Sequence, residues 1–529
     1  MIRKFYLLCL FVVCLTPLCG QVEYLNRYEI ENSWENLNYV VISNEERGAM
    51  FVKHIAQSAG RSKRIEFSHL DQELKEEWTG FFETSKSEFL KGYHYHNNVT
   101  YLLFQVSSDN RIIKIVALDG LKKEVRTFEP KQIVDLNISE FEAIKGSAII
   151  GGYIEGRPAV FVYDMVADAV RTLPNVYQNN SELMEVRVNS DSVTFNVIAS
   201  ELDDKKDRTI LVNTYDYEGN LVRGYQLETD TEHQLLSGVS SSIIDKAQVI
   251  MGLYSVKTGT YPSGYYINHV DRTGRQTMKY LNFGEFESFL DHTGKRRASK
   301  MKARALAAKE NQKEWRYKID VIFREMIELD DKLIIAGEFY KPWTVSTNNQ
   351  IRNRINSSSL SGFNDDFINP MTVRRGRNLN TGNGIIRPPD FSFTHAFALA
   401  VDLKGEVLWD ASFDIKENPE SALQDFGAFQ WQDDETYYAY YHDRELVVKN
   451  LNDTEDKKGL SSPLALLSEE EELRYEKDDF RGVTRWYGNK VLVYGIQHVR
   501  SPDRSSGIRK VFFINSVELG PKTVASKLD

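Results

Sequence analysis

The stretch Ala396-Phe-Ala-Leu-Ala-Val-Asp402-Leu-Lys-Gly405-Glu-Val-Leu-Trp409 decides the fold class of this chain. An apolar run leads to an aspartate, a glycine follows three residues later, and a second strand-like segment begins directly after it. An aspartate can accept hydrogen bonds from backbone amides within a turn, and glycine adopts the positive φ that many hairpins require. The stretch therefore predicts two antiparallel strands joined by a tight turn.

The same strand–turn–strand unit recurs along the chain. The other copies are Asp119-Gly120, Asp216-Tyr-Glu-Gly219 and Asp271-Arg-Thr-Gly274, with a version that lacks the glycine at Asp164-Met-Val-Ala167. The turn positions from Gly120 to Gly274 are 47, 52 and 55 residues apart, whereas Gly274 and Gly405 are 131 residues apart. Roughly four strands per 40–55 residues, repeated seven or eight times, are typical of a β-propeller.

We therefore predict an all-β fold, a seven- or eight-bladed β-propeller that occupies residues 21–529 as one domain. The long spacing before Gly405 predicts an insertion at about residues 286–389. A set of β-sandwiches is the alternative, because sandwiches also place hairpins at short intervals.

The passage from Leu333 to Trp409 adds a strand that ends in Ala336-Gly-Glu-Phe-Tyr340 to the turn unit described above. In these positions it resembles one blade of the bacterial β-propeller repeat family. The resemblance implies that the tryptophan after the turn, Trp409, packs between blades.

All three cysteines, Cys9, Cys14 and Cys19, lie within the first 20 residues. There, two basic residues precede an apolar run over residues 5–15, which is too short to span a bilayer and is typical of a secretory signal. We predict that residues 1–20 are a signal peptide and that the protein is secreted or periplasmic. Lipid attachment at Cys19, as in bacterial lipoproteins, is the alternative.

The mature chain would then contain no thiol, and we expect it to be a monomer without a membrane-spanning segment or a disulfide. A propeller without a disulfide must close by strand pairing. We expect residues 39–52 to pair with residues 510–517 for this purpose.

The predicted insertion is basic. The segment from His292 to Pro389 contains 19 Lys or Arg and 10 Asp or Glu, whereas the whole chain has a formal net charge of −10. Its first part, about residues 286–317, has the composition of a helix, best over Ala298–Gln312. Its second part, about residues 344–391, is a long polar loop, and such loops are usually functional or disordered.

We predict that the two parts meet on one rim of the propeller and bind an anionic glycan or an acidic protein. The residues assigned to this binding surface are Lys295, Arg296, Arg297, Lys300, Arg304, Arg374, Arg375 and Arg377. The alternative is a solvated helix and an insertion whose charge serves solubility. Nucleic acid is disfavoured as a partner, because aromatic residues are sparse among these cations and the predicted compartment is wrong.

Sequence motifs for catalysis are absent: the chain has no His-Glu-x-x-His, no Gly-x-Ser-x-Gly and no phosphate-binding loop. His94 and His96 would lie on one side of a strand, a spacing that can bind zinc or copper, but no third ligand can be identified. The oxygen-rich residues 450–456 could form a calcium loop or an ordinary turn. Ser468 and Glu471 have the spacing of a capping box at the start of a short helix. We assign no catalytic residue, metal or cofactor.

These observations favour an exported, non-catalytic β-propeller that binds a protein or an anionic glycan. The alternative is an extracellular polysaccharide hydrolase or lyase with a carboxylate or Tyr/His site at the propeller channel.

Overall fold

The structure is a computed structural model of the 529-residue chain. The described residues are 22–31, 38–55, 62–131, 133–189, 191, 193–202, 208–257, 261–324, 326–342, 391–415, 419–420, 426–432, 435–453, 459–501 and 507–520. The predicted signal peptide therefore lies outside the described residues. No helix within these ranges is long and apolar enough to cross a membrane.

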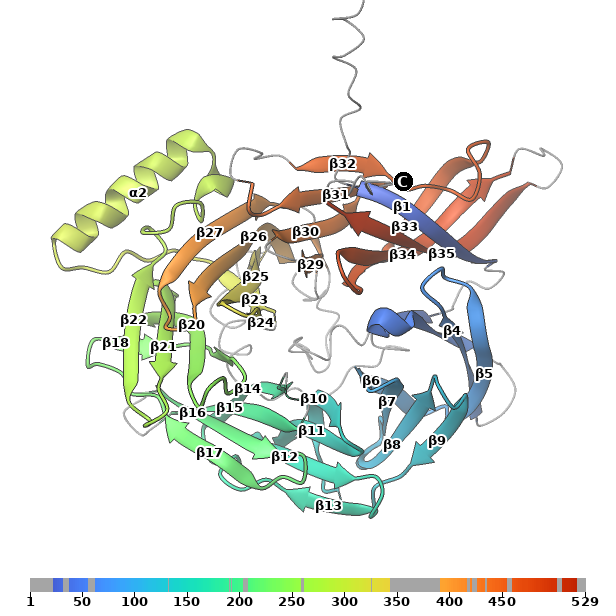
Figure 1. Ribbon diagram of the computed structural model, residues 1–529, viewed down its shortest axis with the longest axis horizontal. Helices are drawn as coiled ribbons and strands as arrows, with labels where there is room; N and C mark the ends of the chain where they lie inside the picture. Colours follow the sequence, from blue (N-terminus) through green and yellow to red (C-terminus); the bar gives the residue numbers. More distant parts are fainter. Residues whose placement is uncertain are drawn as a thin grey trace, which may run out of the picture. The chain divides into compact units, whose positions relative to one another are not determined.

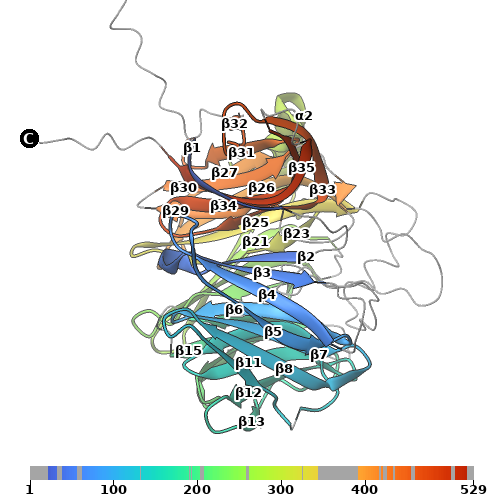
Figure 2. The same cartoon turned by 90° about the vertical axis from the view of Figure 1, so that its right-hand side faces the viewer.

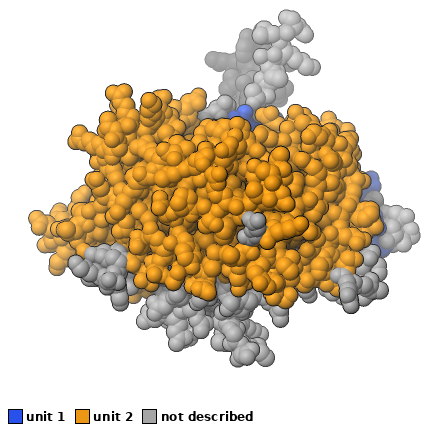
Figure 3. Space-filling view, turned by 90° about the horizontal axis from the view of Figure 1, so that it is seen from below, with its two compact units in different colours: residues 1–32, 427–450, 459–529 blue, residues 33–426, 451–458 orange. Residues whose placement is uncertain are grey.

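The strands form eight antiparallel sheets, so the fold is an eight-bladed β-propeller, at the upper end of the predicted blade count. The chain divides into two compact units, which we describe separately (Figure 3). Unit 2 comprises residues 33–426 and 451–458, and unit 1 comprises residues 1–32, 427–450 and 459–529.

Unit 2 contains six sheets. The first has β2 (Asn38–Ser43), β3 (Ala49–Ile55), β4 (Ser62–Leu70) and β5 (Glu76–Ser85), which are seen from the side in Figure 2. The second has β6 (Glu88–His96), β7 (Val99–Val106), β8 (Asp109–Asp119) and β9 (Glu124–Phe128). The third has β10 (Asn137–Ile144), β11 (Ser147–Ile154), β12 (Arg157–Asp164) and β13 (Ala169–Thr172).

The fourth sheet has β14 (Ser181–Val188), β15 (Thr194–Leu202), β16 (Arg208–Asp216) and β17 (Leu221–Gln226). The fifth has β18 (His233–Leu235), β19 (Val239–Ser240), β20 (Gln248–Val256), β21 (Gly264–Val270) and β22 (Gln276–Asn282). The sixth has β23 (Asp320–Phe323), β24 (Ile327–Glu328), β25 (Lys332–Pro342), β26 (Phe391–Asp402), β27 (Val407–Asp414) and β28 (Pro419–Glu420).

The strands within a sheet differ in burial according to their position. Figure 1 shows β6, β10 and β14 on the inner side of their sheets and β9, β13 and β17 on the outer side. All eight residues of the middle strand β7 are buried, whereas β9 is mostly exposed. The middle strands are apolar on both faces because neighbouring sheets cover them. For example, Leu103 and Ile115 of the second sheet join a cluster with Phe141 and Phe161 of the third.

The predicted turns are confirmed. The carboxylates of Asp119, Asp164, Asp216, Asp271 and Asp402 each accept two backbone N–H bonds at 2.7–3.1 Å. Each turn joins the third strand of its sheet to the outer strand. The glycine at the end of the motif has a φ of 80–87° at positions 219, 274 and 405.

Two details of the turns differ from the prediction. Gly120 does not adopt a positive φ; Lys123 of the same turn does, with a φ of 54°. The first sheet has a further copy of the turn, which the sequence search missed. There, the carboxylate of Asp71 accepts the amides of Glu73 and Lys75 at 2.8 Å, and Leu74 has a φ of 58° in place of a glycine.

Unit 1 contains two sheets. One has β29 (Ala428–Gln432), β30 (Glu435–His442), β31 (Glu445–Asn450) and β32 (Leu460–Pro463). In the other, β33 (Glu472–Arg485), β34 (Lys490–Arg500) and β35 (Ile508–Leu519) are joined by β1 (Val22–Glu31), which pairs with β35 so that Tyr28 lies opposite Ile514.

The expected closing pair was therefore wrong in its N-terminal partner. Residues 39–52 form the β2–β3 hairpin of the first sheet, with the 3-10 turn η1 (Glu45–Arg47) between the strands, and the segment that pairs with β35 is β1. Both segments are apolar enough to be strands, so their composition does not distinguish them.

The short helix predicted after Ser468 was also wrong. Residues 468–471 form a turn in which the Glu471 amide donates to the Ser468 carbonyl at 3.1 Å, and β33 follows directly. The carboxylate of Glu471 binds Arg509 of β35 at 2.5 Å. The ion pair with Arg509 and the start of β33 at Glu472 stabilise the turn in preference to the short helix that the capping box predicted.

The predicted helix in the insertion is confirmed as α2 (Lys295–Glu310), which begins and ends two to three residues earlier than expected. It lies between β22 and β23, preceded by the 3-10 turn η2 (Asp291–Thr293), and Figure 1 shows it outside β22 and β27. The helical part of the insertion therefore enlarges one sheet-to-sheet connection, whereas residues 320–342, within the predicted bounds of the insertion, form strands of the sixth sheet. The predicted loop at about 344–391, with Arg374, Arg375 and Arg377, lies outside the described residues apart from its last residue, where β26 begins.

Candidate functional site

One face of α2 is embedded in the apolar core of unit 2. Ala298, Met301 and Ala305 are buried and recur at helical spacing, so they lie on one side of the helix. Gly284 permits this close packing: a Cβ built there would come within 2.1 Å of the Cβ of Ala305.

The segment before α2 is fastened to β27. The amides of Glu287 and Ser288 donate to the carboxylate of Asp410 at 2.8 and 2.7 Å, and the Ser288 hydroxyl donates to it at 2.6 Å. The Ser412 hydroxyl donates to the Ser288 carbonyl at 2.8 Å. These bonds fix the position from which α2 starts.

The segment after α2 is fastened to the fifth sheet through Glu314. Its carboxylate accepts hydrogen bonds from the Asn282 amide at 2.6 Å and from the Tyr254 hydroxyl at 3.1 Å. The Nε2 atom of His233 lies 3.6 Å from the same carboxylate. Residues 315–318 therefore run beside α2 in a fixed position.

A pocket of about 570 Å³ opens between α2 and residues 315–318. Its lining residues are Arg297, Lys300, Met301, Arg304, Trp315, Arg316, Tyr317, Lys318 and Lys341. We call this the cationic pocket, because six of the nine side chains are basic. The volume falls within the usual range for small-molecule sites in proteins.

The cations of α2 form a row. Arg297, Lys300 and Arg304 lie next to the buried positions 298, 301 and 305, at spacings of three and four residues, and are exposed. At 1.5 Å per residue the row is about 10 Å long. Arg316 and Lys318 come from the facing segment, and Lys341 comes from β25.

Five of the six lining cations have no acidic partner among the described residues. Within the described part of the chain, no carboxylate forms an ion pair with Arg297, Lys300, Arg304, Arg316 or Lys318. The ammonium of Lys318 lies 5.4 Å from the ring centre of Tyr261. Like charges that converge without counter-charges raise the local concentration of anions.

Tyr317 forms the floor of the pocket and is 7% exposed. Its ring stacks on Trp315 at a centroid distance of 5.7 Å, and the ammonium of Lys341 lies 5.5 Å from its ring centre. Its hydroxyl lies 3.0 Å from Nε2 of His292, whose Nδ1 lies 3.0 Å from the Phe289 carbonyl. Because a carbonyl only accepts, we assign the proton to Nδ1, so Tyr317 donates to Nε2.

His292 is neutral in this arrangement. Burial lowers its pKa to about 4, and the charges of Lys341 and Arg297 act in the same direction. Its ring stacks on that of His395 at 3.9 Å, and His395 stacks on Phe339 at 4.7 Å. Burial also holds the pKa of His395 well below its ordinary value. A stack of uncharged rings therefore lies next to the pocket residue Tyr317, which His292 contacts.

The structure divides the predicted binding residues into three groups. Arg297, Lys300 and Arg304 line the cationic pocket, whereas Lys295 and Arg296 are exposed on α2 and do not line it. The remaining three, Arg374, Arg375 and Arg377, lie outside the described residues.

The sequence search missed five of the lining residues that determine the chemistry: Trp315, Arg316, Tyr317, Lys318 and Lys341. The run Trp315-Arg-Tyr-Lys318 was a usable signal, because it places two aromatic and two basic residues side by side shortly after the basic helix.

The two histidines considered as metal ligands have other partners. Nδ1 of His94 lies 2.5 Å from the carboxylate of Glu142 on β10, and Nε2 of His96 lies 2.9 Å from the Asn97 amide. No group of three or more His, Cys, Asp or Glu residues within the described ranges could hold a metal ion. The last residues of the candidate calcium loop, 454–456, lie outside these ranges.

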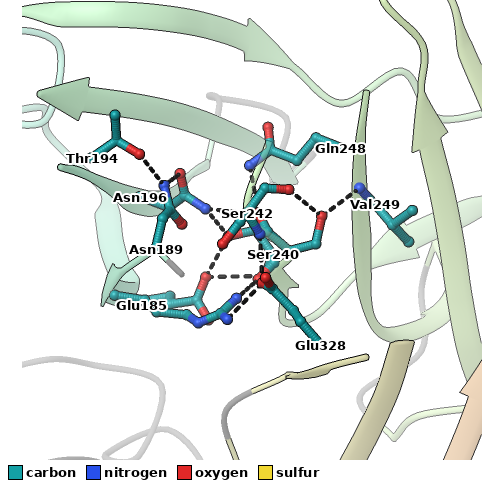
Figure 4. Close-up of polar contacts among 11 residues, drawn as sticks. Glu185, Asn189, Thr194, Asn196, Ser240, Ser242, Gln248, Val249 and Glu328 are labelled. Carbon is teal, nitrogen blue, oxygen red and sulfur yellow. Dashed lines mark hydrogen bonds and ion pairs between the residues drawn. The ribbon is translucent and has the colours of Figure 1, made fainter. Parts of the chain in front are cut away.

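Charged groups also occur on the first strands of the sheets, which face the channel in a propeller. Arg187 of β14 pairs with Glu328 of β24 at 2.6 Å. Glu328 also accepts the Ser242 amide at 2.6 Å (Figure 4). Glu185 accepts both the amide and the hydroxyl of Ser240, at 3.0 and 2.7 Å. These groups bond to one another across three sheets, as is typical of a structural network.

Comparison with known proteins shows no family for this chain. No protein-family model and no curated protein matches the chain. Among solved structures, the chain is similar to the polysaccharide lyase Uly1, with 8% identity and a TM-score of 0.38 over 83% of this chain and 91% of that one. It is also similar to a europium-containing methanol dehydrogenase, with 9% identity and a TM-score of 0.42 over 95% and 94%.

A third similar structure is the β-propeller domain of the Trilobed protease from Pyrococcus furiosus, with 10% identity and a TM-score of 0.29 over 70% of this chain and 100% of that one. Likeness at this level carries no argument about activity. The resemblance of residues 333–409 to the bacterial repeat family, including the packing of Trp409 between blades, stays a prediction.

Proposed function

We propose that this protein is an exported, non-catalytic β-propeller that binds an anionic partner, a glycan or an acidic protein, in the cationic pocket. The observation that carries the proposal is the convergence of six basic side chains on one concavity, five of them without a carboxylate partner among the described residues. Such an arrangement is electrostatically unfavourable when empty and becomes favourable when an anion enters.

A binding role is favoured over hydrolysis or lysis at the channel. Two pairs of titratable groups on the inner strands, Arg187 with Glu328 and His94 with Glu142, are within ion-pair distance of each other. A general acid or base must instead be able to reach a substrate proton.

The test compares two variants of the same charge. Arg297→Gln/Lys300→Gln/Arg304→Gln removes the α2 row from the pocket, and Lys295→Gln/Arg296→Gln/Lys313→Gln removes three exposed cations that do not line it. On columns of immobilised polygalacturonate, heparin and polyglutamate, we expect the pocket variant to elute at lower salt than the control from at least one matrix. Equal elution of the two variants from every matrix would refute the proposal.

The remaining parts of the proposal have separate readouts. Incubation of the protein with each polymer is expected to release no shorter products, and depolymerisation would contradict the non-catalytic assignment. Export predicts that protein recovered outside the cytoplasm begins at Gln21. An N-terminus at residue 1 would show that the signal peptide is not cleaved. A lipid on Cys19 would show that the protein is anchored to a membrane and not secreted.

A further inference from the structure

Building on the proposed function, we infer that the ligand of the cationic pocket is a linear oligosaccharide with one acidic group per sugar ring, of the uronate type, laid along α2. The inference combines three features of the pocket: a row of cations, an aromatic wall and a concave shape.

The cations are arranged along a line and not around a point. Arg297, Lys300 and Arg304 follow the axis of α2 with rises of about 4.5 and 6 Å between successive residues. A single phosphate or sulfate ion could contact only part of such a row. A chain molecule with regularly spaced charges, about one per sugar ring, can meet all three.

The aromatic wall suits a sugar. Trp315 lines the pocket and is half-buried, with its ring stacked on Tyr317. The C–H face of a pyranose ring is apolar and covers an indole well, whereas an acidic peptide offers carboxylates on flexible side chains with no such face. Glu314 and the His292–Tyr317 hydrogen bond hold the Trp315 and Tyr317 rings in position before a ligand binds. The conformational entropy lost on binding is therefore small.

The charged groups suit carboxylates. Three of the six lining cations are arginines, whose planar guanidinium groups can bind a carboxylate through two parallel hydrogen bonds. A cavity of about 570 Å³ accommodates a slender chain, whereas protein–protein interfaces are broad and extend well beyond one pocket.

The experiment titrates the intact protein with galacturonate oligomers of two, four and six rings by calorimetry. Neutral galactose oligomers of equal length, heparin tetrasaccharide, a hexaglutamate peptide and oligothymidylate serve as comparison ligands. We expect uronate affinity to rise from two rings to four and then to level off, because the row is only about 10 Å long. The neutral oligomers, the peptide and the oligonucleotide should bind at least tenfold more weakly.

Two variants identify the parts of the pocket. Arg297→Gln/Lys300→Gln/Arg304→Gln should abolish uronate binding, whereas Lys295→Gln/Arg296→Gln/Lys313→Gln should retain it. Trp315→Leu should weaken uronate binding about tenfold, and Trp315→Phe should restore most of it, as expected for stacking on a ring. Thermal unfolding of each variant verifies that it is folded.

The outcomes separate the inference from the proposed function. If heparin, the peptide or the oligonucleotide binds through the α2 row at least as tightly as the uronates, the uronate inference fails and an anion-binding pocket remains. If no anion binds, both fail. If Trp315→Leu binds uronates as tightly as the unaltered protein, the aromatic wall has no part in recognition and the inference is overturned.

Discussion

His292 contacts both the buried His395 in the core of unit 2 and Tyr317 in the cationic pocket. It donates through Nδ1 to the Phe289 carbonyl and accepts from the Tyr317 hydroxyl through Nε2, and its ring stacks on His395. Protonation would place a charge on Nε2, would leave the Tyr317 hydroxyl without its acceptor, and would add a cation beside Lys341 and Arg297. The neutral imidazole therefore holds the floor of the pocket in place.

This residue gives the protein an acid-sensitive stability. The unfolded chain binds a proton at a pKa near 6.5, whereas in the folded state the pKa of His292 is lowered to about 4. Stability is therefore fully present above about pH 6.5 and is lost as the pH falls through the folded value, by on the order of 3 kcal/mol at pH 4.

Urea unfolding at pH 7, 5.5 and 4.5 measures this effect. The difference in unfolding free energy between the unaltered protein and His292→Gln should shrink as the pH falls, because the variant has no imidazole to titrate at this position. A difference that stays constant across the three pH values would show that His292 does not titrate in this way.

At the scale of elements, the sheet turns are determined by contacts that are local in sequence, whereas the position of α2 is determined by remote ones. The turns are local: in each, an aspartate binds amides two to four residues ahead, so the pattern survives changes elsewhere in the sheet. The position of α2 depends instead on contacts that are remote in sequence. They are Asp410 with the segment before the helix, and Gly284 against Ala305.

Gly284→Ala tests this placement of α2. The new methyl group would come within 2.1 Å of the Ala305 Cβ, so the helix must move. We expect a loss of about 1–3 kcal/mol in unfolding free energy, as is usual for overpacking. Binding of the anionic polymer should also weaken.

The control is a double-mutant cycle with Ala305→Gly, which makes room for the new methyl group but weakens the helix by about 1 kcal/mol on its own. The double variant should lose less than the sum of the two single losses. Strict additivity would mean that Gly284 and Ala305 do not limit the approach of the helix.

At the scale of the whole molecule, the ends of the chain are joined within one sheet of unit 1. Arg27 of β1 pairs with Glu29 at 2.7 Å and donates to Gln497 at 2.9 Å, to Asn515 at 3.1 Å and to the Ala465 carbonyl at 3.1 Å. Arg27 and Glu29 are each only 5% exposed. A buried cation with four partners thus fastens the first strand to segments near the C-terminus without any disulfide.

Arg27→Met should therefore destabilise unit 1. Breaking this buried ion pair leaves Arg509, 3.3 Å away, to compensate the carboxylate of Glu29 only in part. We therefore expect a loss of about 3 kcal/mol in unfolding free energy, near the low end for buried pairs. Arg111→Met breaks the exposed pair with Asp109 and should leave the midpoint of chemical unfolding nearly unchanged. Equal midpoints for the two variants would contradict a fastening role for Arg27.

The sequence by itself determined the features that neighbouring residues encode. Alternating apolar strands, the aspartate turns and the alanine- and lysine-rich helix are set by short-range periodicity, backbone sterics and turn hydrogen bonds, so the propeller and α2 were predictable. The basic row of α2 was predictable for the same reason, because three- and four-residue spacing places Arg297, Lys300 and Arg304 on one face.

Only the tertiary structure decided which remote segments come together. The pairing of β1 with β35, the ion pair that replaces the expected capping box at Ser468, and the addition of Trp315, Tyr317 and Lys341 to the α2 cations all depend on sheet order and packing. In each case, more than one segment of the chain has a local sequence that would allow it to form the observed strand, turn or pocket lining. The choice among them is made by the burial and hydrogen bonding of the assembled sheets, which no local pattern contains.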